Sequence, residues 1–161
     1  MKKWIAALLC LCAMLSFASC RSGDSKEGWT FQTGGVTLKI GDKCADALKQ
    51  LESGCRSKRA TGSCANAAGE DVLYTYDGFR LTTFREKEND PNEKLCTVEF
   101  LTDAVKTPEG ITVGSTVDAV KAAYGTPTSE DGSALTYDKG NTRLRFALRD
   151  GKVSGVTYLA L

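Results

Sequence analysis

The spacing of hydrophobic residues changes from every second position to helical spacing and back along the chain. Residues 36–40 alternate between apolar and polar side chains, which is typical of a half-buried strand. The next apolar residues recur at helical spacing, from a capping residue at Asp42 to a stop at Gly54. Strand-like alternation then returns three times, in residues 72–76, 79–84 and 95–101.

The same order of patterns begins again near residue 110. Ser115 is placed to cap a helix whose apolar face carries Val117, Val120 and Tyr124, and Gly125 ends it. Strand patterns follow in residues 135–137, 142–148 and 153–161.

The two halves match position by position, which predicts an internal repeat. Gly41 and Gly114 precede the two helices at corresponding places. The first half carries a longer loop after its helix, residues 55–71. We therefore expect an α+β fold of two tandem helix-plus-antiparallel-meander repeats, with the helices packed on one face of an antiparallel sheet. The repeats would span residues 29–106 and 107–161.

The first 28 residues have the composition of an export signal followed by a tether. Two lysines precede an apolar run that is too short for a membrane span, so residues 1–19 are interpreted as a signal peptide. Small residues stand directly before Cys20, as in the lipobox of bacterial lipoproteins. We expect Cys20 to be lipidated and residues 20–28 to tether the domain to the extracytoplasmic face of the cell membrane. An ordinary cleaved signal is the alternative.

Four cysteines remain in the expected mature domain, and an even number in an exported chain favours disulfides. One candidate pair is Cys55 with Cys64, which flank a loop, and the other is Cys44 with Cys96. Zinc binding and buried free thiols are the alternatives, although the spacing contains no C-x₂-C pair.

Composition excludes several classes of function. The sequence contains no histidine, which removes His-based catalysis and His-ligated metal sites. Net charge is +1, from 21 Lys+Arg and 20 Asp+Glu, without the basic excess of a nucleic-acid-binding protein. We therefore predict a non-enzymatic protein with no cofactor, no bound metal and no nucleic-acid partner.

Several short motifs resemble those of known proteins. The repeated helix-and-three-strand unit resembles the fold of β-lactamase-inhibitor protein and of small lipoprotein modules that assist outer-membrane assembly. A second resemblance rests on the motifs Ser63-Cys64-Ala65, Tyr74-Thr75-Tyr76, Phe79, Thr83, Thr107-Pro108-Glu109-Gly110-Ile111 and Tyr124-Gly125. In these motifs the chain resembles an uncharacterised family of surface lipoproteins of Gram-positive bacteria, and this resemblance implies no activity.

Strand alternation predicts one open sheet face that carries charged side chains. Its candidate binding residues are Arg80, Glu99, Arg143 and Arg145, and arginine is enriched at protein interfaces. A solvated face with cross-strand ion pairs is the alternative. We expect a lipid-anchored cell-envelope protein that binds an envelope or extracellular protein. A carbohydrate or small-ligand binder at the same face is a second hypothesis, and fold analogy alone suggests an inhibitor of a secreted or envelope hydrolase.

Overall fold

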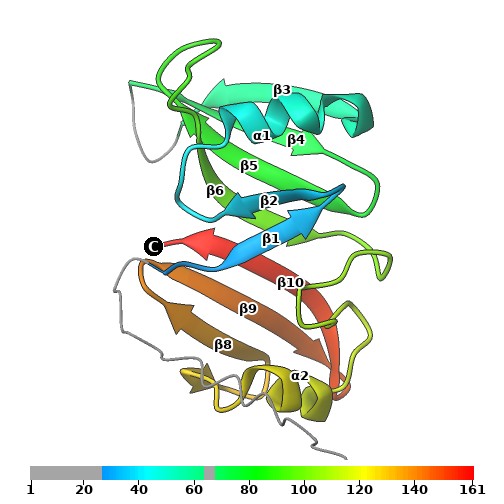
Figure 1. The fold of residues 1–161 in the computed structure, drawn as a ribbon. Coiled ribbons are helices and arrows are strands. Elements are labelled where there is room, and N and C mark those ends of the chain that lie inside the picture. Colours follow the sequence, from blue (N-terminus) through cyan, green and yellow to red (C-terminus); the bar gives the residue numbers. More distant parts are fainter. Residues whose placement is uncertain (1–26, 64–67) are drawn as a thin grey trace, which may run out of the picture.

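The computed structural model describes residues 27–63 and 68–161, and within them two antiparallel sheets. The small sheet is a hairpin of β1 (Thr30–Thr33) and β2 (Val36–Lys39). The large sheet has eight strands in the order β3-β4-β5-β6-β10-β9-β8-β7 (Figure 1). Its strands are β3 (Ser57–Gly62), β4 (Glu70–Thr75), β5 (Phe79–Arg85), β6 (Lys94–Phe100), β7 (Ser129–Glu130), β8 (Ala134–Lys139), β9 (Thr142–Arg149) and β10 (Lys152–Ala160).

The expected fold of tandem repeats with helices packed on a sheet is wrong. The described residues are mostly antiparallel sheet, with 47% in strands, 13% in helices and only two α-helices. These helices, α1 (Ala45–Gln50) and α2 (Val117–Tyr124), span 6 and 8 residues, and a 3-10 turn at Glu52–Gly54 follows α1. Helices of about two turns are too short to cover an eight-stranded sheet. Pairing of β6 with β10 instead makes the strands of both halves one continuous sheet.

The β1–β2 hairpin covers the centre of the large sheet. Phe31 on β1 is 0% exposed, and its ring centroid lies 5.1 Å from Phe79, 5.6 Å from Phe100 and 6.2 Å from Tyr158. Those three rings come from β5, β6 and β10, so one side chain packs across the junction of the two halves. The hairpin turns at Gly34–Gly35, where both glycines have positive φ, as the tight turn requires.

Both helices begin at residues other than those expected. Cys44, rather than Asp42, is the N-cap of α1, and it makes no side-chain capping hydrogen bond. The cap of α2 is Thr116, whose Oγ1 accepts a hydrogen bond from the Ala119 amide at 3.2 Å. Ser115 instead accepts from the Thr112 amide in the preceding turn.

Part of the loop expected at residues 55–71 is the strand β3, which pairs with β4. All six of its residues are exposed, so the strand has no apolar alternation from which it could be predicted. Backbone hydrogen bonding to β4 forms it instead.

A β-bulge turns Cys96 away from the inward position that strict alternation with Val98 and Phe100 would give it. Thr82 pairs with Thr97, whereas Thr83 pairs with Leu95, so Cys96 is an extra residue in β6. Leu95 is 0% exposed and takes the inward position that alternation gave to Cys96. The expected disulfide between Cys44 and Cys96 is not formed, since both are free thiols.

We predict that Phe31→Ala lowers the free energy of unfolding by about 3–5 kcal/mol, because it leaves a cavity where β5, β6 and β10 meet. Gln32→Ala, at the next and exposed position, is the control and should change stability by less than ~0.5 kcal/mol. Urea denaturation of the two variants measures the difference. Equal stabilities would show that the hairpin does not hold the two halves together.

Candidate functional site

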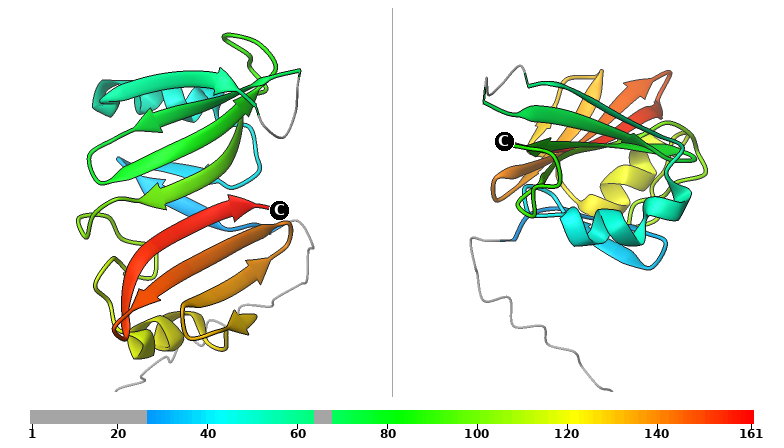
Figure 2. Two further views of the ribbon diagram at one scale, coloured as in Figure 1. Left: turned by 180° about the vertical axis from the view of Figure 1, so that it is seen from behind. Right: turned by 90° about the horizontal axis from the view of Figure 1, so that it is seen from above.

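One face of the large sheet is left bare by the described chain. In the left view of Figure 2 the sheet lies in front, with the β1–β2 hairpin and α1 behind it. Directly paired residues form a continuous row across this bare face, from β4 to β8. The row consists of Thr75, Arg80, Glu99, Thr157, Arg145 and Thr136.

The four residues predicted for a binding face all lie on this bare face. Arg80 and Glu99 are cross-strand partners, and Nη1 of the arginine lies 3.3 Å from Oε2 of the glutamate. Arg145 belongs to the same row, because it pairs with Thr157, which in turn pairs with Glu99. Arg143 is two residues from Arg145 on β9 and therefore points to the same side.

Positive charge is in excess on the β9 part of the bare face. Arg143 forms two hydrogen bonds with Asp138, at 2.7 and 2.9 Å, and this interaction lowers the pKa of the carboxyl group. Arg145 is exposed and forms no ion pair with any other described residue. Arg149 is also exposed at the end of the strand. The bare face therefore presents guanidinium groups that are available to an acidic partner.

The structure also contains a groove that the sequence did not predict, between α1 and the start of β3. Its volume is about 490 Å³, and it lies on the side of the sheet opposite the bare face. The groove is lined by Leu48 and Lys49 of α1, by Cys55 and Lys58, and by the aromatic rings of Tyr74 and Tyr76.

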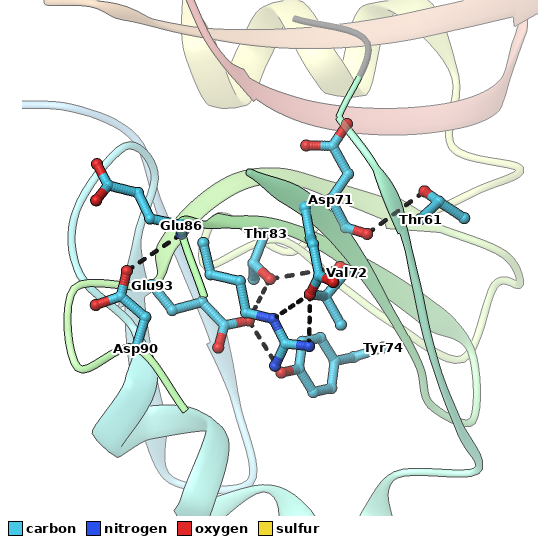
Figure 3. A network of polar contacts seen from close by, with 10 residues as sticks. Thr61, Asp71, Val72, Tyr74, Thr83, Glu86, Asp90 and Glu93 are labelled. Atoms are coloured by element: carbon cyan, nitrogen blue, oxygen red, sulfur yellow. Dashed lines mark hydrogen bonds and ion pairs between the residues drawn. The ribbon is translucent and has the colours of Figure 1, made fainter. Parts of the chain in front are cut away.

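A buried carboxylate, that of Glu93, holds one end of this groove together (Figure 3). The side chain is 5% exposed, and its Oε1 accepts hydrogen bonds from Tyr74 Oη at 2.9 Å and from Thr83 Oγ1. Its backbone carbonyl accepts from the Cys44 amide at 2.8 Å and from the Cys44 thiol at 3.4 Å. Glu93 thus ties the start of α1 to β4 and β5.

An ion pair between a buried arginine and a partly exposed glutamate lies beside this carboxylate. Arg85 is 5% exposed, and its Nη2 and Nε lie 2.9 and 3.0 Å from Oε2 of Glu70. The guanidinium group is near enough to Tyr74 to affect the pKa of its phenol. The inner side of β4 and β5 therefore carries a connected set of polar side chains that fixes the shape of the groove.

The two tyrosines that line the groove, and the Cys44 thiol at the start of α1, are neutral at physiological pH. Burial, followed by the hydrogen bond to Glu93, raises the pKa of Tyr74, and burial raises the pKa of Tyr76 to about 12. Burial also raises the pKa of the Cys44 thiol to about 12. Lys58 Nζ lies 5.2 Å from the centroid of the Tyr74 ring, a cation–π contact at the rim. The groove therefore offers aromatic surfaces and hydroxyl groups rather than an activated nucleophile.

The remaining predicted site residues are either free thiols or outside the described residues. Cys55 is a half-buried free thiol in the groove, and Cys20 and Cys64 lie outside the described residues. In residues 27–63 and 68–161, no three Cys, Asp or Glu side chains are grouped so that they could hold a metal ion. The same residues contain no helix that is both long and apolar enough to cross a membrane.

Neither Glu93 nor the groove was predicted from the sequence, because residues 86–94 are rich in charged side chains, which is typical of a solvated loop between strands. One signal was present in the strand pattern. Alternation from Phe79 and Leu81 places Thr83 and Arg85 on the inner side of β5. Buried polar side chains need hydrogen-bond partners, which pointed to an acidic residue nearby.

No protein-family model, no curated protein and no solved structure matches this chain. The assignment of function therefore depends on the bare face and the groove themselves.

We predict that Tyr74→Phe and Glu93→Leu are energetically coupled. Glu93→Leu should lower the free energy of unfolding by about 2–4 kcal/mol, because two buried hydroxyl groups lose their acceptor, and Tyr74→Phe by ~1 kcal/mol. The double variant should lose less than the sum, by about 0.5–3 kcal/mol.

Urea denaturation of the four proteins in this cycle gives the coupling energy. Glu88→Gln, at an exposed position of the same loop, is the control and should leave stability unchanged. Additive losses would show that the Tyr74–Glu93 hydrogen bond does not contribute to stability.

Proposed function

We propose that this protein is a non-enzymatic binding protein of the cell envelope, anchored through a lipid on Cys20, which holds a partner protein on the bare face of its large sheet. The row of paired residues across the bare face is the observation that carries this proposal. An antiparallel sheet needs to bury only one face to be stable. Here the β1–β2 hairpin and the aromatic cluster around Phe31 provide that burial.

The bare face has the composition of a protein-binding surface. The row contains two arginines, one glutamate and three partly exposed threonines, and Leu159 lies beside it between Thr97 and Arg143. Interfaces are enriched in arginine, and a broad face gives the contact area that a stable complex requires. A sheet face that contacts only water needs no arginine, because short polar side chains keep it hydrated. The three arginines on β9 therefore favour a binding role for this face over a merely solvated one.

The excess of arginine on β9 specifies the charge of the partner. Arg143 is neutralised by Asp138, but Arg145 and Arg149 are not ion-paired with any residue in the described ranges. An acidic protein surface would complement these two groups, which would speed association and select against basic partners.

Arg145→Glu is expected to reduce binding of the partner by tenfold or more. Reversal of a charge at the centre of an interface costs at least about 1.4 kcal/mol, which is a tenfold change in affinity. The partner is first recovered from envelope extract with the wild-type chain, and its affinity for purified variants is then measured.

Lys106→Glu is the matched control, because it makes the same charge change at an exposed loop position away from the bare face. The control should bind within about twofold of wild type. Equal affinity of the Arg145→Glu and wild-type proteins would rule out the bare face as the binding surface.

A further inference from the structure

β3 is an edge strand with one unpaired side. It stands at one end of the strand order of the large sheet, and β4 is its only partner among the described strands. An unpaired strand edge presents backbone N–H and C=O groups that can pair with another chain. All six residues of β3 are exposed, so these groups are accessible.

The register shows which backbone groups point outward. Ser63 donates its amide hydrogen to the Gly69 carbonyl at 3.0 Å, so these residues form a hydrogen-bonded pair. Hydrogen-bonded and non-hydrogen-bonded pairs alternate along antiparallel strands. Because Ala60 pairs with Val72 and Lys58 with Tyr74, both belong to the non-hydrogen-bonded set. The N–H and C=O groups of Lys58 and Ala60 therefore point to the free edge.

The groove adjoins the start of this edge strand. It is bounded on one side by α1 and on the other by residues 55–58, which include Ser57 and Lys58 of β3. Alternate side chains of a strand point to the same face of its sheet. A segment added beside β3 would therefore direct every second side chain toward Leu48 and Tyr74 in the groove.

We propose that the edge of β3 and the groove beneath α1 together bind an extended acidic peptide segment by strand addition. Backbone hydrogen bonds to Lys58 and Ala60 supply affinity, and the groove accepts an apolar or aromatic side chain of the peptide. This site lies on the side of the sheet opposite the bare face, so it is independent of the function proposed above.

The groove lining is mixed in charge, with Glu52 and Asp90 beside Lys49, whereas the edge strand is basic, and its charge favours an acidic peptide. Residues 55–62 contain three basic side chains and no acidic one. Arg56 is paired with Asp77, whereas Lys58 and Arg59 form no ion pair within the described part of the chain. Lys49 adds a further ammonium group from α1, where it pairs with Asp46. Lys58 lies on the groove side with Tyr74, and Arg59 points to the other face, so carboxylates on the two faces of an added strand would each meet a basic group.

Basic residues on an edge strand also have a protective role, because they prevent sheets from joining edge to edge. The two roles differ in one respect. A protective role requires no groove next to the edge. The groove of about 490 Å³ beside β3 is large enough for a bulky side chain, and this favours peptide binding.

The test selects binders to the full chain from a library of random eight-residue peptides. Enriched peptides should combine Asp or Glu with an apolar or aromatic residue at alternating spacing. Their affinities are measured by fluorescence anisotropy against wild type and four variants. Ala60→Pro removes an outward N–H without breaking the β4 ladder, and it should weaken binding at least tenfold. Ala60→Thr keeps the N–H and should bind within twofold of wild type.

Lys58→Glu tests the role of charge without altering the backbone, and it should weaken binding of the acidic peptides about tenfold. Arg145→Glu, on the bare face, should bind them as wild type does. Failure to enrich any peptide, or equal affinity of wild type and Lys58→Glu, would overturn the proposal. It would also be overturned if wild type formed dimers that Ala60→Pro abolishes, since the edge would then pair with a second copy of the chain.

Discussion

The pairing of β6 with β10 is the constraint on which the rest of the structure depends. Three residue pairs, with Tyr158 opposite Val98 at their centre, join strands that lie far apart in the sequence. Both of these residues are 0% exposed, and Phe31 of the hairpin packs against the ring of Tyr158. Without this junction the chain would have two small meanders, each with an exposed edge. With it, Glu99 and Arg145 become neighbours of the same threonine, Thr157.

The two proposed binding surfaces depend on different parts of the sheet. The bare face depends on the register between β6 and β10, whereas the groove depends on the buried carboxylate of Glu93. Glu93 fixes the start of α1 through its backbone and fixes β4 and β5 through its side chain. Because the surfaces lie on opposite sides of the sheet, a partner protein and a peptide segment would be able to bind at the same time.

The sequence predicted local elements better than their assembly. Alternation placed Arg80, Glu99, Arg143 and Arg145 on a shared side of their strands, because side-chain direction has a strict period of two. The tandem-repeat fold was wrong because a local pattern does not determine which strands pair. The bulge at Cys96 and the exposed strand β3 cannot be predicted from the spacing of hydrophobic residues, because both arise from backbone hydrogen bonding. Glu93 was missed because burial of a charged residue depends on partners contributed by other strands.

Site-specific photo-crosslinking measures most directly whether the bare face holds a partner. A photoreactive amino acid is placed at Thr157, in the centre of the row, or at Thr37, an exposed position of the hairpin on the other side of the sheet. Irradiation of cells that carry each variant should give a defined adduct from position 157 and none from position 37. An adduct from position 37 alone, or from neither position, would contradict the account.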